Sequence, residues 1–156
     1  MEVVQLDDNI GLFVGPDVDD WKPVLAQGIH AIIDMDSGLD IGVPEIPNGL
    51  VYLYFPFDDV LKLPDLDKLQ AIAKFGASLL LSGEKVLSHC GMGHNRCALM
   101  AGLILKELGM SGEAAVALIR QKRPGALYNK VFVSYLIEGK IDQALLEESG
   151  MVAEER

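Results

Sequence analysis

The sequence has no long hydrophobic run, no basic N-terminal segment and only two cysteines among its 156 residues. No apolar stretch approaches the roughly 18–20 residues that a membrane-spanning helix needs. The N-terminus reaches Asp7 and Asp8 within a few residues, so it also lacks the basic region and apolar core of a secretory signal. These absences predict no membrane partner. Because two cysteines make a poor extracellular disulfide framework, they also favour a cytoplasmic location.

Positive charge is scarce too, with 13 Lys and Arg against 23 Asp and Glu and a net charge of −10. A protein of this sign repels phosphate backbones, so no nucleic-acid partner is expected. The exception is a local basic patch, formed by Arg120, Lys122, Arg123 and Lys130. Two interpretations of the basic patch are open: cations that stabilise a helix end, or a surface that recruits acidic phosphopeptides.

Half of the residues are hydrophobic and 23% are charged, which predicts one globular domain over residues 1–156. Apolar segments rich in branched residues predict strands over 10–14, 29–34, 50–55 and 85–88. Helical spacing and capping residues predict helices over 21–27, 66–80, 95–108, 112–122, 129–138 and 141–148. Strands first alternate with helices, so we expect an α/β fold with a mainly parallel central sheet of about four to five strands, flanked by helices. We expect residues 35–48 to form an exposed loop, His30 to pack in the core, and the protein to be a monomer.

The segment SHCGMGHNRC, residues 88–97, contains both cysteines and two of the three histidines. It follows a predicted strand and opens a predicted helix, so its backbone N–H groups and the helix N-terminus favour an oxyanion. Gly91 and Gly93 permit close approach of the backbone, and Arg96 offers a planar fork for two phosphate oxygens. The partial positive charge of the helix N-terminus and the charge of Arg96 should lower the pKa of Cys90, which makes its thiolate a candidate nucleophile.

A metal site is the alternative interpretation, with His89, Cys90, His94 and Cys97 as ligands. Structural zinc sites usually draw paired ligands from two separated segments, and this set leaves Arg96 unexplained. We therefore expect neither a metal nor another cofactor.

Residues 89–96 fit the pattern His-Cys-x-x-Gly-x-x-Arg and resemble the signature loop of the cysteine-dependent protein tyrosine phosphatases. The segment YFPFDD, residues 54–59, resembles the general-acid segment of the dual-specificity members, especially the phosphatases of regenerating liver. IRQKRPGA, residues 119–126, is similar to a segment that follows the signature helix in many of them. The resemblance implies a phosphatase-like fold and hydrolysis of phosphate monoesters without a metal.

The resemblance also implies roles for individual residues. Cys90 is the expected nucleophile, Arg96 the phosphate clamp and Asp59 the general acid and base, with Asp58 as the alternative acid. The expected phosphate-binding residues are Gly91, Met92, Gly93, His94, Asn95 and Arg96. The expected supporting residues are His89, Cys97 and Asn129.

Cys97 departs from the family pattern, which usually has Ser or Thr after the signature arginine. Because a thiol is a weaker hydrogen-bond donor than a hydroxyl, we hypothesise that breakdown of the phosphocysteine is slow and that Cys97→Ser accelerates it. A second hypothesis is that Cys90 and Cys97 form a reversible disulfide under oxidants.

The substrates implied are phosphorylated proteins or peptides carrying phosphotyrosine, with phosphoserine and phosphothreonine as further candidates. Two alternatives stay open. One is a phosphoinositide or phosphoglycan phosphatase on the same scaffold, and the other is a pseudophosphatase that binds phosphate without catalysis.

Overall fold

The computed structural model describes residues 2–43, 46 and 48–139, and its centre is a five-stranded sheet in the order β1-β2-β5-β3-β4. The strands are β1 (Val4–Asp7), β2 (Ile10–Gly15), β3 (Ile29–Asp34), β4 (Val51–Tyr54) and β5 (Lys85–His89). β1 pairs antiparallel to β2, whereas the other three pairings are parallel. The predicted fold class is therefore confirmed, and β1 is the one strand that the sequence did not predict.

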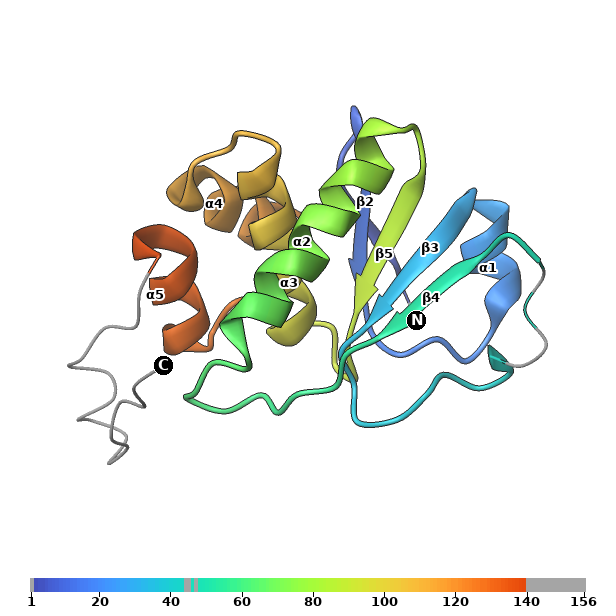
Figure 1. Ribbon diagram of the computed structural model, residues 1–156, viewed down its shortest axis with the longest axis horizontal. Helices are drawn as coiled ribbons and strands as arrows, with labels where there is room; N and C mark the ends of the chain where they lie inside the picture. Colours follow the sequence, from blue (N-terminus) through green and yellow to red (C-terminus); the bar gives the residue numbers. More distant parts are fainter. Residues whose placement is uncertain (1, 44–45, 47, 140–156) are drawn as a thin grey trace.

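Helices cover both faces of this sheet unequally (Figure 1). The short α1 (Trp21–Ala26) packs against one face, in a small cluster that includes Val24, Phe13 and Leu87. The other face carries the larger core and the other helices of the described residues, α2 (Leu66–Leu81), α3 (Arg96–Glu107), α4 (Gly112–Lys122) and α5 (Lys130–Glu138). The predicted helix over residues 141–148 lies outside the described residues.

The helix starts follow the capping residues in the sequence. The side chains of Asp20, Asp65, Ser111 and Asn129 each accept a backbone N–H in the first turn of α1, α2, α4 and α5. The prediction for His30 was wrong, because this residue, the second of β3, occupies the one exposed position of the strand. None of the described helices combines the length and apolarity that crossing a bilayer requires.

The parallel register brings three chain segments together at one edge of the sheet. Gly15 of β2 and Asp34 of β3 both lie opposite His89, the last residue of β5. Ligands of open α/β sheets bind beyond this carboxyl edge. The segment that resembles the phosphatase signature begins at this edge, between β5 and α3.

Candidate active site

The loop between β5 and α3, residues 90–95, is held in a tight shape by its neighbours. Gly93 adopts φ 75°, and a Cβ atom there would lie 2.7 Å from the backbone of Gly15 and Pro16. Arg123 fastens the loop from the other side, donating from Nε to the Gly93 carbonyl at 2.9 Å and from Nη2 to the Met92 carbonyl at 3.2 Å. Only glycine fits position 93, which explains its place in the motif.

The Cys90 thiol lies at the start of this loop and is 2% exposed. A hydrogen bond from the Cys97 thiol is the largest influence on its pKa, and it opposes the effect of burial. With the N–H groups of Cys97 and Gly93 and the charge of Arg96, it lowers the pKa of Cys90 to about 6. Cys90 is therefore mostly a thiolate at neutral pH, as a nucleophile needs to be.

The Arg96 guanidinium lies beside the loop and reaches toward two other segments. Its Nη1 donates to the carbonyls of Phe57 at 3.2 Å and Met35 at 3.4 Å, and it lies 3.4 Å from Asp36 Oδ1. Its Nε is buried and has no hydrogen-bond partner among the residues that the structure describes. A buried donor without a partner costs about 1–3 kcal/mol, and an oxyanion in the loop would satisfy it.

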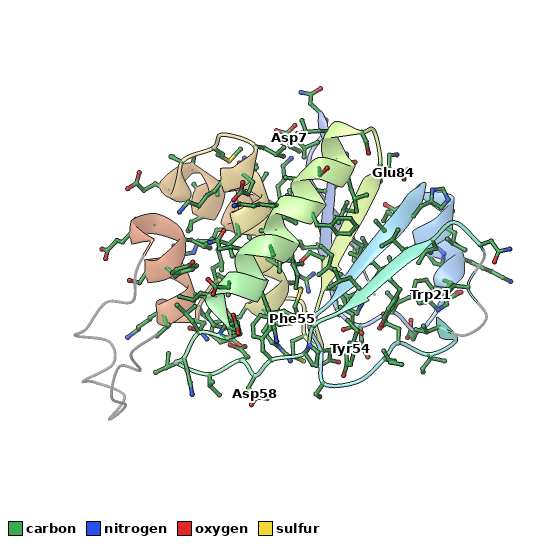
Figure 2. All side chains as sticks on the ribbon, in the orientation of Figure 1. Asp7, Trp21, Tyr54, Phe55, Asp58 and Glu84 are labelled. Atoms are coloured by element: carbon green, nitrogen blue, oxygen red, sulfur yellow. The ribbon has the colours of Figure 1, made fainter. Side chains whose placement is uncertain are left out.

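Asp59 and Asp58, the two candidate acids, have different surroundings. Asp59 Oδ2 accepts from Asn95 Nδ2 at 2.8 Å, and its Oδ1 accepts from Asn129 Nδ2 at 2.8 Å. Asn95 immediately precedes Arg96, so these bonds bring Asp59 to the phosphate loop. Asp58 is exposed and points away from the body of the molecule (Figure 2). The geometry therefore favours Asp59 as the acid.

Behind the loop lies a buried ionic cluster, which we define as Asp34, Asp40, Tyr52 and His89. His89 Nε2 is 2.7 Å from Asp40 Oδ2 and 3.9 Å from Asp34 Oδ1, and the three residues are buried. The Tyr52 hydroxyl contacts both carboxylates, donating to Asp34 and lying 3.0 Å from Asp40 Oδ2. Val18 N–H also donates to Asp40 Oδ1 at 2.9 Å.

Burial and charge act against each other in this cluster. Burial would lower the pKa of His89, but the close contact and charge of Asp40, aided by the charge of Asp34, raise it overall. Burial raises the pKa of Asp34, against the bonds that it accepts from Tyr52 and from Asp36 N–H. Burial, together with the bond to Asp34, also raises the pKa of Tyr52. His89 is therefore held as an imidazolium paired with Asp40.

Sequence reasoning missed three members of the cluster, Asp34, Asp40 and Tyr52. The prediction of an exposed loop over 35–48 was wrong at Met35 and at Asp40, which are 0% and 7% exposed. The only sequence signal is the acidic residue that ends the apolar segment 29–34, at the edge of the sheet where ligands bind.

The remaining predicted residues lie in or beside the loop. Met92 is 70% exposed, and the ring of His94 packs at a tilt against Tyr128 with 6.3 Å between ring centroids. Two members of the basic patch brace the backbone: Arg123 holds the loop, and Arg120 Nη2 donates to the Leu127 carbonyl at 2.8 Å. Arg123 therefore lies at the loop itself, and recruitment of acidic phosphopeptides by the basic patch stays a prediction.

The metal alternative receives no support from the geometry. Among the described residues, the group whose ligand atoms converge within 4.8 Å consists of Asp34, Asp40 and His89. The quartet of histidines and cysteines in residues 89–97 does not form such a group. In the converging group, the short contact between His89 and Asp40 is the ion pair described above.

Comparisons with known proteins give sequence relatives and fold neighbours, although no family model matches the chain. Protein tyrosine phosphatase type IVA 2 of Mus musculus is 37% identical over 111 residues, which are 71% of this chain and 54% of that protein. Type IVA 3 of Homo sapiens is 37% identical over 87 residues, 53% of this chain and 49% of that protein. The chain thus matches only about half the length of these curated relatives.

Solved structures share the fold over nearly the whole chain. Human DUSP28 has a TM-score of 0.74 at 20% identity and covers 94% of this chain and 97% of its own. The human tyrosine phosphatase-like serine/threonine/tyrosine-interacting protein has a TM-score of 0.69 at 26% identity, with coverages of 86% and 92%. The sequence relatives and the fold together confirm the resemblance to the cysteine-based protein tyrosine phosphatase superfamily, in its dual-specificity-like form.

Proposed function

We propose that the chain is a phosphatase of dual-specificity type that hydrolyses phosphate monoesters through a phosphocysteine on Cys90. The observation that supports this best is the meeting of three groups from distant segments. The pKa of the Cys90 thiol is lowered to about 6, and the Nε of Arg96 is buried without a hydrogen-bond partner among the described residues. Asp59 is held by two amide groups. All three residues lie at the same loop, between β5 and α3. Each group suits one part of phosphoryl transfer.

In the first step, the Cys90 thiolate attacks phosphorus while the loop amides and Arg96 bind the equatorial oxygens. The P–O bond to the leaving group breaks, and its electron pair goes to the leaving oxygen. Protonated Asp59 gives that oxygen its proton, so the alcohol or phenol departs neutral. Preorganised donors around the phosphoryl group supply the largest part of the rate enhancement.

In the second step, water attacks the phosphocysteine, and ionised Asp59 accepts the proton of that water. The P–S bond breaks, and the sulfur of Cys90 leaves as a thiolate. The Cys97 thiol lies beside this sulfur and donates to it. Since a thiol is a weak donor, Cys97 stabilises the leaving thiolate less than a hydroxyl would, in line with a slow second step.

We propose phosphotyrosine on proteins or peptides as the first substrate class, with phosphoserine and phosphothreonine next. The loop residues Gly91, Met92, His94 and Asn95 include no lysine of the kind that phosphoinositide phosphatases often carry there. A cytoplasmic location remains part of the proposal, because a thiolate nucleophile must stay reduced.

The pseudophosphatase alternative has one relevant neighbour, the human tyrosine phosphatase-like serine/threonine/tyrosine-interacting protein. The combination of Cys90, Arg96 and Asp59 favours an enzyme over a binding module.

The test of the proposed function is hydrolysis of an aryl phosphate by the wild type, Cys90→Ser and Asp59→Asn. We expect Cys90→Ser to abolish turnover and the wild-type rate to rise with pH through about 6, where Cys90 ionises. Activity that survives Cys90→Ser, or a wild type that binds phosphate without turnover, would reject the proposal.

A further inference from the structure

We infer that Asn95 and Asn129 form a two-amide clamp that holds Asp59 over the phosphate site before any substrate binds, and so act as positioning residues for proton transfer to the leaving group. The inference rests on the proposed role of Asp59 as the general acid. The family resemblance gave Asn95 only a place in the phosphate loop and Asn129 a general supporting role.

The clamp grips the two oxygens of the carboxylate separately. Asn95 Nδ2 donates to Oδ2 and Asn129 Nδ2 donates to Oδ1, each at 2.8 Å. Asn129 Nδ2 also donates to the carbonyl of Val60 at 2.9 Å, so it ties the backbone of the acid segment as well. One bond to each oxygen fixes both the position and the plane of the Asp59 carboxylate.

The amide groups of the clamp are themselves fixed, because their oxygens accept backbone N–H groups. Asn95 Oδ1 accepts from Asn129 N at 3.0 Å. Asn129 Oδ1 accepts from Val131 N at 3.1 Å and from Phe132 N at 3.2 Å, where it caps α5. With each oxygen occupied by a donor, each NH₂ group must face Asp59. Asn95 and Asn129 are 1% and 5% exposed, which leaves them little rotamer freedom.

Asp59 needs such a clamp because nothing else in its own segment holds it. Residues 55–59 form no helix or strand, and Asp59 is exposed. Without partners, an exposed side chain on a loop samples several rotamers, whereas proton transfer requires one of them. Arg96 Nη1 also donates to the Phe57 carbonyl at 3.2 Å, so the segment that carries Asp59 is bonded to the arginine expected to bind the phosphate. The acid is thus positioned by the residues that surround the phosphate.

The clamp leaves room for the proton that the acid transfers. Each carboxylate oxygen has two lone pairs, and each accepts one amide N–H here. The remaining lone pairs can carry the proton. It moves to the leaving oxygen as that oxygen takes the electron pair of the breaking P–O bond. A phenol with a very acidic hydroxyl leaves without this proton, so only esters of weakly acidic leaving groups depend on the clamp.

The experiment compares kcat/KM for phosphotyrosine with kcat/KM for a fluorinated coumarin phosphate, whose leaving group is strongly acidic. The ratio kcat/KM reports formation of the phosphocysteine, so a slow second step does not hide the effect. Asn129→Ser keeps a capping oxygen for α5 but does not reach Asp59. Asn129→Asp keeps the cap and the size of the side chain but replaces the donor with a repelling charge. Asn95→Ser removes the other amide, and Asn9→Ser, in the turn between β1 and β2, is the matched control.

We expect each clamp variant to lower kcat/KM for phosphotyrosine about 10-fold or more, with the largest loss in Asn129→Asp, and to change the coumarin substrate less than about 3-fold. Adding Asn129→Ser to Asp59→Asn should cause no further loss. Two results would overturn the clamp. One is an equal loss of kcat/KM on both substrates. The other is no loss in any clamp variant although Asp59→Asn does lose phosphotyrosine activity. If Asp59→Asn itself spares phosphotyrosine activity, the acid assignment fails instead, and the clamp fails with it.

Discussion

Two polar clusters flank the phosphate loop, and they are built in opposite ways. On the open side, Asn95 and Asn129 hold one exposed carboxylate through neutral amides. On the inner side, the buried ionic cluster pairs His89 with Asp40 and Asp34 out of contact with solvent. Neutral amides position a group that must gain and lose a proton in the reaction, whereas the buried carboxylates hold an imidazolium that takes no part in proton transfer to the substrate. The difference predicts that mutations on the inner side mainly change stability and those on the open side mainly change chemistry.

The largest expected effect is the loss of stability in Asp40→Asn. This change removes the counter-ion of a buried imidazolium, and breaking a buried pair costs about 3–5 kcal/mol in the free energy of unfolding. Urea unfolding monitored by circular dichroism measures it. Asp59→Asn, on the open side, should change the free energy of unfolding by no more than about 1 kcal/mol. Similar losses in the two variants would contradict the comparison.

The stability difference between the wild type and Asp40→Asn should also depend on pH. Folding raises the pKa of His89 above its ordinary value of 6.5. The folded state therefore binds the proton more tightly, and the contribution of the pair is complete below pH 6.5 and lost as pH rises through the raised pKa. The two unfolding curves should approach each other at alkaline pH. A difference that grows with pH would show that His89 is buried neutral.

Tyr52→Phe should have a smaller effect, because it removes one hydroxyl and leaves the ion pair in place. The two carboxylates that the hydroxyl contacts lose a buried hydrogen-bond partner, at a cost of about 1–3 kcal/mol. Thermal unfolding of the variant gives this value. A variant as unstable as Asp40→Asn would mean that the hydroxyl, and not the ion pair, holds the cluster together.

The smallest effect expected concerns Cys97, whose thiol donates to the Cys90 thiol. Cys97→Ala removes the strongest influence on the Cys90 thiol and should raise its pKa from about 6 by about one pH unit, equivalent to one hydrogen bond of ~1.4 kcal/mol. Cys97→Ser keeps a donor and should leave the pKa low. The pH dependence of alkylation by iodoacetate reports both. An unchanged midpoint in Cys97→Ala would exclude this hydrogen bond.

The sequence was sufficient to predict what depends on local pattern. Strands 10–14 and 29–34 and the helix over 112–122 lie where periodicity and caps put them, and the loop between β5 and α3 was visible as a motif. The short β1 was missed because it is an edge strand that, among the described strands, pairs with β2 alone. The buried ionic cluster was missed for a different reason. Asp40 lies in a segment rich in glycine, proline and acids, and only tertiary packing against His89 distinguishes it from a solvated loop residue.

The measurement that most directly tests the central claim is detection of the phosphocysteine. Asp59→Asn protein is mixed with an activated aryl phosphate, quenched in acid within milliseconds, digested and analysed by mass spectrometry. A phosphoryl group should appear on the peptide that contains Cys90 and be absent in the Cys90→Ser, Asp59→Asn double variant. A protein that hydrolyses the substrate with no phosphoryl adduct, or with one on another residue, would contradict the account.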